Sequence, residues 1–313
     1  MTRFILTRIG LGIALLWVVS TLTFLLLQLV PGDPASIILG GQGTPNQIAQ
    51  LRNRLGLDQS VLTQYGAWLG RLVRGDLGQS VISGQSVFSI LSQRAPVTLS
   101  LAIVATLVSV VIGVGLGVLA AVRGRWVDRV VRVGTGVAVA MPNFWVGAIL
   151  VLIFSVWWGV LPSVGYVSLW TSPTSWLRFM VLPIAAVAAA SVAGIARQTR
   201  AARQSALESE YIQTLRGAGF SARSITYKHA LRNAAIPVVT VVGWQFVGLL
   251  GGAVLVEQVF ALPGLGQETI QATTDHDIPI LQGLVIYATG IVLIVNLIID
   301  LVYAGLNPKV RHP

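Results

Sequence analysis

Long apolar runs separated by short polar segments dominate this 313-residue chain. A helix needs about 20 apolar residues to cross the roughly 30 Å hydrocarbon core of a bilayer. Six segments meet this requirement, at about 9–30, 98–122, 133–158, 179–196, 236–256 and 283–305. The pattern therefore predicts an all-α polytopic membrane protein with six transmembrane helices.

The fourth of these runs is short and rich in alanine. It contains Pro183 near its start and small residues at Ala185, Ala189, Ser191 and Gly194. Small residues let a neighbouring helix approach closely. We therefore expect this helix to be buried inside the bundle.

The first run follows Arg3 and Arg8, which also suits a signal peptide. Its apolar stretch is too long for that, and no small-x-small cleavage site precedes the polar segment 31–34. We interpret residues 1–31 as an uncleaved anchor helix. Residues 32–97 then form a long loop, and residues 98–313 form a core of five transmembrane helices.

Composition agrees with a membrane protein, because only 10% of the residues are charged, against about 25% in soluble domains. The net charge of +10 could indicate nucleic acid. However, basic residues in cytoplasmic loops orient membrane proteins, and no basic patch with interleaved aromatic residues lies outside the runs. We expect the lipid bilayer as a partner and no nucleic acid. The chain has no cysteine, which excludes disulfides and thiolate sites.

The distribution of Lys and Arg over the short loops predicts the orientation. Basic residues cluster at both termini and in the loops after the second and fourth runs. The loop after the third run has only Arg178, and the loop at 257–282 has none but carries Glu257, Glu268, Asp275 and Asp277. By the positive-inside rule, both termini of this multi-pass protein lie on the cytoplasmic side of the cell membrane.

The long loop at 32–97 is expected outside the cytoplasm as a small folded cap. Residues 47–57 predict a short helix after a cap at Asn46, and residues 64–73 have apolar side chains at helical spacing. Gly75–Gly78 predicts a turn.

A basic segment lies at about 197–235, between the fourth and fifth runs. Its basic residues are Arg197, Arg200, Arg203, Arg216, Arg223, Lys228 and Arg232. Leu207, Tyr211 and Leu215 recur every four residues and predict an apolar stripe on a helix that also carries Glu210.

Gly217 and Gly219 are predicted to end that helix, because glycine readily adopts the left-handed conformation. Ser221 can cap a second helix that continues to Asn233, with Phe220 and Ile225 packing as a hydrophobic staple. Lys228 and Arg232 then share one face. The alternative is a loop that only determines the membrane orientation. Such a loop would need neither the break at Gly217 and Gly219, called here the glycine elbow, nor the hydrophobic staple. We therefore expect a docking surface for a soluble partner at about 205–233.

Short motifs mark the chain from one end to the other. They are Leu29–Pro34, Leu55–Asp58, Gly75–Gly78, Arg94–Leu99, Met141–Trp145, His229–Ala234, Glu257–Phe260, Pro263–Gly266 and Asn307–Arg311. In these motifs the chain resembles the permease subunits of ABC importers for dipeptides and oligopeptides. The resemblance covers essentially the whole chain and implies the type I ABC importer permease fold.

This resemblance implies that the basic segment couples the permease to an ATPase. The residues concerned are Leu207, Glu210, Tyr211, Leu215, Arg216, Gly217, Gly219, Phe220, Ser221, Lys228 and Arg232. The family pattern there begins Glu-Ala-Ala, where this chain has Tyr211-Ile212-Gln213. The partners implied are a second homologous permease subunit, two ABC ATPase subunits and an extracytoplasmic substrate-binding protein.

The chain itself shows no catalytic constellation. It has no G-x-x-x-x-G-K-[ST] phosphate loop, and its three histidines, His229, His276 and His312, are widely separated. We expect no enzyme activity and no cofactor or metal in this chain. The resemblance implies that ATP and Mg²⁺ bind to the partner ATPase subunits.

Polar residues within transmembrane runs are functional candidates by default. For a translocation pathway these are Pro142, Asn143, Gln245, Glu257, Asn296 and Asp300. Pro142 frees a backbone carbonyl and predicts a kink, which could equally serve packing alone. Asp300 could pair with a loop arginine. Glu257, Asp275 and Asp277 lie at the predicted outer mouth of the pathway, and Asp275 and Asp277 could be solvated loop charges.

Other functions fit the same pattern less well. Nickel and glutathione permeases share the family layout, although a nickel route might be expected to carry histidines in the spans, which are lacking. An ion channel would leave the shaped cytoplasmic segment without a role. A membrane-embedded enzyme lacks the catalytic residues.

Overall fold

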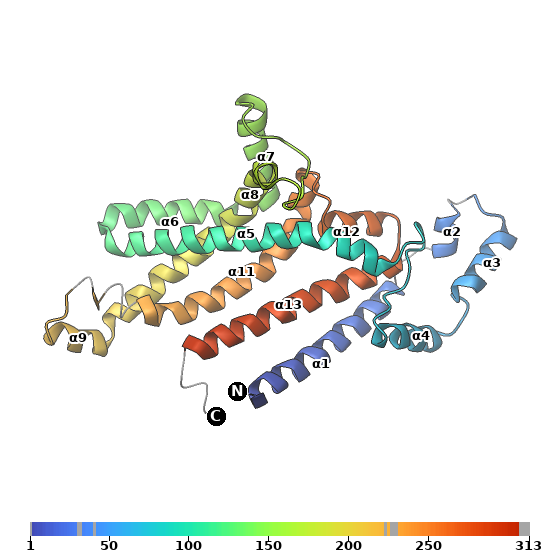
Figure 1. The fold of residues 1–313 in the computed structure, drawn as a ribbon, viewed down its shortest axis with the longest axis horizontal. Helices are drawn as coiled ribbons and strands as arrows, with labels where there is room; N and C mark the ends of the chain where they lie inside the picture. The colour runs from blue at the N-terminus through green and yellow to red at the C-terminus, as the bar shows by residue number, and fades with distance from the viewer. Residues whose placement is uncertain (1, 30–32, 40–41, 222–223, 226–230, 307–313) are drawn as a thin grey trace. The chain divides into compact units, whose positions relative to one another are not determined.

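The computed structural model describes residues 2–29, 33–39, 42–221, 224–225 and 231–306 (Figure 1). Every regular element in those ranges is a helix, and one isolated antiparallel bridge joins Gln79 to Ser86. The helices divide into two compact units. Unit 1 comprises Met1–Pro96 and Gly264–Ile294, and unit 2 comprises Val97–Pro263 and Val295–Pro313.

Five helices are long and apolar enough to cross a membrane. They are α1 (Thr2–Leu27), α5 (Val87–Val122), α8 (Pro173–Glu208), α11 (Leu231–Val259) and α13 (Ile278–Leu306). A sixth crossing exists only if the bent pair around Pro142 counts as one span. The prediction of an all-helical, multi-pass membrane protein is confirmed, whereas the number six stays a prediction.

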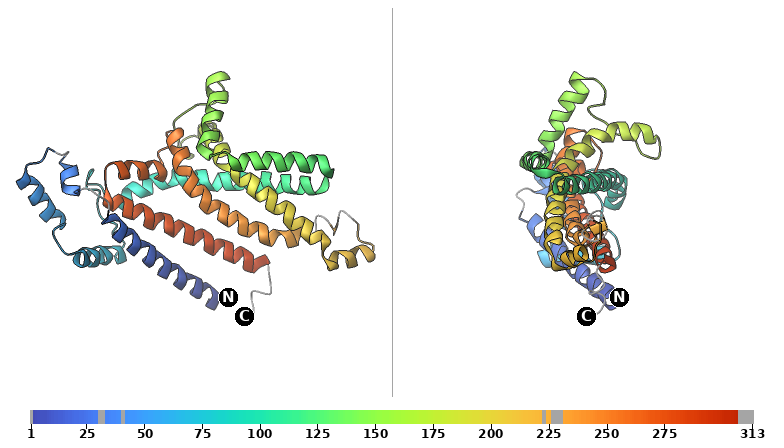
Figure 2. Two further views of the ribbon diagram at one scale, coloured as in Figure 1. Left: turned by 180° about the vertical axis from the view of Figure 1, so that it is seen from behind. Right: turned by 90° about the vertical axis from the view of Figure 1, so that its left-hand side faces the viewer.

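The predicted third span, 133–158, is not one helix. It consists of α6 (Gly124–Ala140), α7 (Asn143–Leu150) and a π-helix, η1 (Val151–Trp157). The two parts meet at an angle of 102° (Figures 1 and 2). A kink was expected at Pro142, but the chain breaks there, because a residue before proline avoids the helical region and Met141 is extended.

Helix α8 is much longer than the predicted fourth span. It starts behind Ser172, whose hydroxyl accepts a hydrogen bond from the Ser175 amide, and it runs for 36 residues through Pro183. Arg197, Arg200 and Arg203 therefore belong to this helix and not to a surface loop. The reason is local, because arginine is a good helix former and no glycine or proline follows before Gly217.

The core of unit 2 forms around α8. Met180 and Val187 of α8 are fully buried and belong to one cluster with Leu101 of α5 and Phe260 after α11. Helices α6, α7 and α11 all pack against α8. The prediction that the fourth apolar run is buried in the bundle is confirmed.

Helices α5 and α8 approach closely at two glycines. A Cβ atom on Gly117 would lie 2.6 Å from the carbonyl oxygen of Ala196, and one on Gly113 would lie 2.8 Å from the Cβ of Ile195. The glycines are four residues apart and so occupy one face of α5. This is the small-xxx-small geometry by which membrane helices pack.

Unit 1 contains the predicted helices of the long loop. They are α3 (Pro45–Leu55) and α4 (Val61–Val73), and a further helix, α2 (Pro34–Ile38), was not predicted. The cap of α3 is Thr44 and not Asn46, because Thr44 and Gln47 form a reciprocal capping box and Pro45 suits the first helical position. The turn at Gly75–Gly78 is confirmed, with both glycines at positive φ.

Aromatic side chains attach α4 to α1 within unit 1. The ring centroid of Phe24 lies 5.3 Å from that of Tyr65 and 5.4 Å from that of Trp68. The Tyr65 hydroxyl also lies 2.8 Å from the Thr21 hydroxyl. This part of the chain is therefore folded onto α1.

The acidic segment after α11 is packed and not an open loop. It contains α12 (Leu265–Thr274), whose Glu268 is nearly buried and forms an ion pair with Arg94 at 3.2 Å. Asp277 is 1% exposed and accepts a hydrogen bond from the Ser80 hydroxyl at 2.5 Å. The interpretation of Asp277 as a solvated loop charge is therefore wrong, because the carboxylate caps the start of α13 beneath the 75–86 loop.

Candidate functional site

The predicted docking surface starts at a break between two helices. Helix α8 ends at Glu208, Ser209 is extended with ψ 149°, and α9 runs from Glu210 to Gly217. The prediction that Leu207, Tyr211 and Leu215 form a stripe on one continuous helix is therefore wrong, because Leu207 belongs to α8 and the other two belong to α9. The break changes the register, and the residue that points inward on α9 is Ile212.

Ile212 anchors α9 to the rest of the segment. It is fully buried and packs with Ile225, while Leu207 and Leu215 cover the pair. Tyr211 is 36% exposed, and Glu210 is exposed as well. Sequence reasoning missed Ile212 because it assumed an unbroken helix, although an isoleucine in the first turn of a short amphipathic helix was the available signal.

The glycine elbow depends on Gly219 alone. Gly219 has φ +81°, whereas Gly217 is the last helical residue of α9 and has no positive φ. The Phe220 amide donates to the carbonyl oxygen of Leu215 at 3.1 Å, which is the hydrogen bond of a Schellman C-cap. The prediction of a glycine-terminated helix is confirmed, and the special conformation belongs to the second glycine.

The second half of the segment is described only in part. The Ser221 hydroxyl accepts a hydrogen bond from the Ser224 amide at 3.2 Å, so the predicted cap is confirmed. Phe220 is 47% exposed and Ile225 packs on Ile212, so the staple stays a prediction.

Several predicted docking residues lie outside the described structure. Lys228 falls outside the described residues, as do the side chains of Arg216 and Arg232. The backbone of Arg232 belongs to α11, which begins at Leu231. The end of the predicted second helix at Asn233 is therefore wrong, because residues 231–233 are already part of the long helix.

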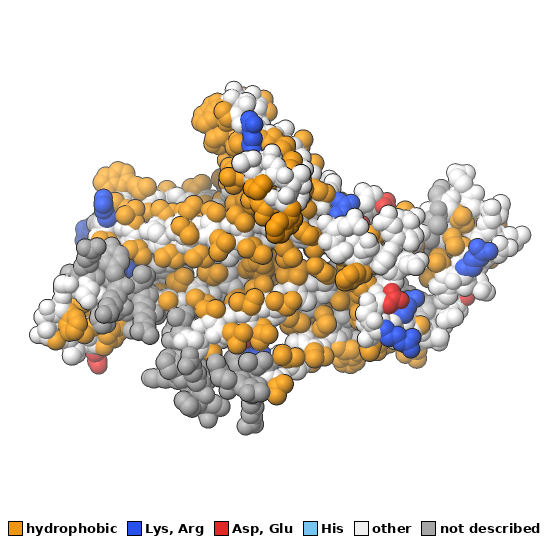
Figure 3. Space-filling view, in the orientation of Figure 1, with side chains coloured by type: hydrophobic (Ala, Val, Ile, Leu, Met, Phe, Trp, Pro, Cys, Tyr) orange, Lys and Arg blue, Asp and Glu red, His pale blue; other side chains and the backbone are white. Residues whose placement is uncertain are grey.

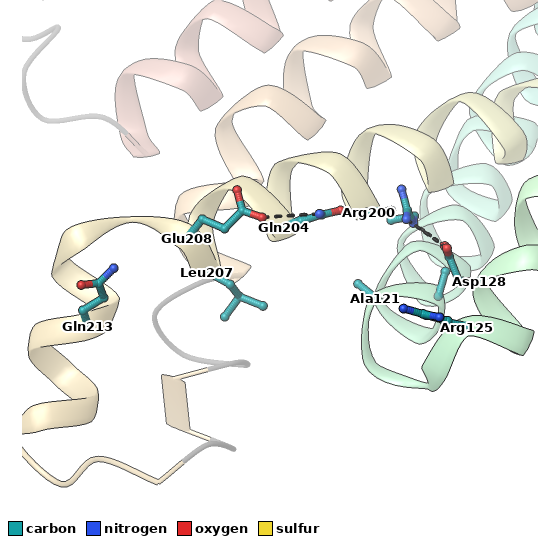
Figure 4. A pocket seen from close by; sticks show the side chains of 9 residues that line it. Ala121, Arg125, Asp128, Arg200, Gln204, Leu207, Glu208 and Gln213 are labelled. Atoms are coloured by element: carbon teal, nitrogen blue, oxygen red, sulfur yellow. Dashed lines mark hydrogen bonds and ion pairs between the residues drawn. The ribbon is translucent and has the colours of Figure 1, made fainter.

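A pocket of about 620 Å³ opens beside α9 (Figure 4). Its polar lining comes from α6, α8 and α9, and Ala120 and Ala121 close it at the end of α5. The remaining lining residues are Arg125, Asp128, Arg200, Gln204, Leu207, Glu208 and Gln213. Two of the four helices that meet here, α5 and α6, were not expected at the docking surface.

An ion-pair cluster fixes one wall of this pocket. Asp128 of α6 accepts two hydrogen bonds from Arg200 of α8, through its Oδ1 from Nε and through its Oδ2 from a terminal nitrogen at 3.0 Å. Arg132 approaches the same carboxylate at 3.2 Å. This bidentate geometry holds α6 against α8. The sequence signal was a single aspartate among four arginines, but its partner lies 72 residues away.

Two predicted pathway residues, Asn143 of α7 and Gln245 of α11, lie along one face of α11, about 10 Å apart along the helix. A Cβ atom on Gly194 of α8 would lie 1.9 Å from the amide nitrogen of Gln245, and one on Gly252 of α11 would lie 2.7 Å from the amide nitrogen of Asn143. Positions 245 and 252 are seven residues, or two turns, apart and thus share a face. The structure therefore gathers both amides between α7, α8 and α11, where glycines make room for them.

Glu257 does not lie at an open mouth. Its side chain is 0% exposed, and Thr98 of α5 donates a hydrogen bond to its Oε1 at 2.6 Å. The Leu262 amide donates a hydrogen bond to the backbone carbonyl oxygen of Glu257 at 2.8 Å. The chain itself encloses this carboxylate, so Glu257 is not exposed at an outer mouth in this structure.

The remaining candidates are scattered. Pro142 is exposed at the break before α7. Asn296 is exposed on α13, and Asp300 is partly buried one turn later. Ile299 of α13 packs toward Gly243 of α11. Among the described residues, no group of three or more His, Asp and Glu side chains could hold a metal ion.

Comparison with known proteins identifies the family. The profile of the family described as "binding-protein-dependent transport system inner membrane component" matches residues 113–312, and the profile of its N-terminal part matches residues 1–102. The chain belongs to this family. It is therefore a multi-pass permease of the inner membrane.

Relatives match the permease along its whole length. A protein of Brucella abortus (strain 2308), provisionally named a peptide transport system permease protein, is 39% identical over all of both chains. A protein of Sinorhizobium fredii, provisionally named a peptide ABC transporter permease protein, is 36% identical over 99% of both. The glutathione transport system permease protein of Escherichia coli (strain K12) is 36% identical over all of both chains.

A solved structure shows the same fold. The permease superimposes with a TM-score of 0.56 on a chain of the MetNI methionine ABC transporter, over 70% of its own length and 97% of that chain. The two sequences are only 19% identical. The likeness extends to the helical architecture and not to the residues of the sites described above.

Proposed function

We propose that this permease is the membrane-spanning subunit of an ATP-driven importer of peptides. The observation that carries the proposal is the match over the whole chain to relatives named as peptide permeases. Glutathione is itself a tripeptide, so import of glutathione is the second candidate, favoured by the match to the glutathione permease.

The proposed topology has six crossings with both termini in the cytoplasm. It counts α6 together with α7 and η1 as the third crossing. Arginines at the α5–α6 junction and in the last turns of α8 support a cytoplasmic location for the pocket beside α9. The folded segment with α2, α3 and α4 then forms an extracytoplasmic cap.

The proposed contact with the ATPase consists of α9, the Gly219 elbow and the neighbouring pocket. Tyr211 and Phe220 expose aromatic surface there, and a hollow lined by both carboxylates and arginines lies next to them. Exposed aromatic residues beside a polar hollow are typical of a protein interface. Because Ile212 and Ile225 hold this element together, a partner can push on it as one body.

In this proposal the chain performs no chemistry. Two ATPase subunits bind ATP and Mg²⁺, a second homologous permease completes the pathway, and an extracytoplasmic binding protein delivers the substrate. The amide side chains of Asn143 and Gln245 are the proposed pathway groups. Amides can donate to and accept from a peptide backbone, which suits a substrate of variable sequence.

Transport in proteoliposomes tests the function. The permease is reconstituted with the co-encoded second permease, ATPases and binding protein, and ATP-dependent uptake of labelled dipeptides, longer peptides, glutathione and Ni²⁺ is measured. We expect uptake of peptides. Uptake of glutathione alone would select the second candidate, whereas uptake of Ni²⁺ alone, or flux without ATP, would overturn the proposal.

A substitution at the elbow tests the coupling surface. Gly219→Val places a β-branched residue at φ +81°, which costs roughly 1–2 kcal/mol or more and should displace the loop after α9. We expect ATPase activity to persist while uptake falls severalfold. Gly217→Ala is the matched control, because its site is open and helical. Normal uptake by the Gly219→Val complex at normal abundance would remove the elbow from the coupling surface.

A further inference from the structure

The helix pair after the break at Pro142 carries an apolar stripe that is exposed along its length. Trp145, Ile149, Leu152 and Val156 are 58%, 37%, 43% and 66% exposed. Their spacing of four, three and four residues places them on one side of α7 and η1. The opposite side, with Gly147 and Phe154, packs against the core of unit 2.

The direction of this helix pair differs from that of a crossing helix. It lies at 102° to α6, which is 12° from perpendicular. Transmembrane helices tilt by about 20° on average from the bilayer normal. If α6 follows that normal, α7 and η1 run within roughly 30° of the membrane plane.

Tryptophan stands at both ends of the stripe. Trp145 lies at the start of α7, and Trp157 and Trp158 follow at the end of η1, 69% and 63% exposed. The next loop adds Trp170, 91% exposed. Tryptophan concentrates at the membrane–water interface. Such belts occur at both interfaces, but the 8 residues of α7 and the 7 of η1 span only about 22 Å. This is less than the roughly 30 Å hydrocarbon core, so tryptophan at both ends favours a segment that stays near one interface.

The composition of the surrounding chain excludes a charged partner. No Asp, Glu, Lys or Arg occurs between Arg132 and Arg178. The exposed apolar surface also continues onto α6, where Val133 and Val137 are 62% and 54% exposed. In Figure 3 hydrophobic side chains cover much of the part formed by α7 and η1. Lipid is the occupant that matches an uncharged, tryptophan-flanked surface continuous with a membrane helix.

We propose that α7 and η1 lie parallel to the membrane plane, in the interface at the extracytoplasmic face of the inner membrane. The stripe of Trp145, Ile149, Leu152 and Val156 then faces lipid acyl chains. This replaces the third crossing counted above, α6 with α7 and η1, by α6 alone, whose 17 residues span about 26 Å. The segment from α7 to α8 then follows the membrane surface. A break at proline provides this change of direction, because neighbouring helices can satisfy the backbone groups that it frees.

Depth measurements test this placement directly, and the absence of cysteine from the chain makes every introduced cysteine the only thiol. Nitroxide labels are placed by Trp145→Cys, Ile149→Cys, Leu152→Cys and Val156→Cys in the assembled complex. The complex is held in nanodiscs of phosphatidylethanolamine and phosphatidylglycerol. Collision with oxygen and with a water-soluble nickel chelate then reports the depth of each label.

Helix α1 offers a matched control with the same spacing. Leu11, Leu15, Val18 and Leu22 are exposed along a candidate span. Eleven residues of helix along the normal change the depth by about 15 Å. We expect that range on α1 and a range below about 8 Å, at shallow depth, on the stripe.

Two results would overturn the proposal. A depth range on the stripe equal to that on α1 would show a completed crossing. Labels shielded from both oxygen and the nickel chelate would show that a protein partner covers the stripe instead of lipid. Ala148→Cys, at another exposed position of α7, replaces any stripe variant that does not accumulate.

Discussion

The contact between α5 and α8 at Gly117 leads to a quantitative prediction. A methyl group added at this position would place its carbon 2.6 Å from the carbonyl oxygen of Ala196 and 2.6 Å from the Cβ of Thr199. Comfortable carbon contacts begin at about 3.5 Å, so the helices would have to separate by roughly 0.9 Å. The obstacle includes backbone, which cannot rotate away as a side-chain tip can.

The neighbouring Gly115 provides the reference for this measurement. It lies on the same helix, faces away from α8 and has nothing within 4 Å of an added Cβ atom. The intrinsic gain from replacing glycine by alanine in a helix, about 1 kcal/mol or less, is common to both positions. The difference between Gly117→Ala and Gly115→Ala therefore isolates the cost of the contact, and overpacking of this kind costs about 1–3 kcal/mol.

Unfolding in mixed micelles measures this difference. The free energy of unfolding is obtained by titration with sodium dodecyl sulfate, followed by tryptophan fluorescence. We expect Gly117→Ala to be less stable than Gly115→Ala by about 1–3 kcal/mol. Gly113→Ala should fall between them, because its contacts, 2.8 Å to the Cβ of Ile195 and 3.0 Å to the carbonyl oxygen of Val192, are longer than those at Gly117. Equal stability of the Gly117 and Gly115 variants would refute the close packing of α5 on α8.

Three further predictions concern side chains described above. Asp128→Asn should lower the free energy of unfolding by about 2 kcal/mol because Arg200 loses a charged acceptor, whereas the exposed control Arg129→Gln should change it by less than about 0.5 kcal/mol; equal effects would show that the ion pair contributes nothing. Glu257→Ala should destabilise the permease by about 2 kcal/mol or more without changing its affinity for the binding protein, since the carboxylate is enclosed; weaker binding at unchanged stability would contradict this. Alkaline phosphatase fused after the exposed Thr274 should be active, and an inactive fusion at normal abundance would reverse the proposed topology.

Hydropathy predicted the long helices well because the cost of burying charge in lipid leaves little freedom. Five apolar runs correspond to α1, α5, α8, α11 and α13. The exception is the third run. Composition shows that residues 133–158 are apolar, but it does not show in which direction the chain continues after Pro142. A proline removes a hydrogen bond, whereas the bend angle depends on how Gly147 packs against Phe260 and Ala186.

The docking segment was predicted in location but not in detail, for a related reason. Nothing between Arg197 and Gly217 is a strong helix breaker, so the interruption at Ser209 could not be read from local propensity. It is explained by tertiary packing, because it lets Ile212 reach Ile225. Pairings between distant residues were equally hidden, as with Asp128 and Arg200 or Thr98 and Glu257, since no local pattern specifies the partner.

Helix α8 joins the two candidate sites physically. Near its end, Arg200 and Gln204 line the pocket beside α9, and six residues before Arg200 it carries Gly194, against which Gln245 packs. Six residues of helix span about 9 Å, without glycine or proline between them. A displacement that an ATPase passes across the break at Ser209 to the end of α8 would therefore reach the Gln245 contact through one rigid helix. The Gln245 amide packs tightly on Gly194, so a small shift of Gly194 would force this amide to repack. Transmission along α8 therefore favours a helix bundle that switches between two packed arrangements over one that deforms gradually.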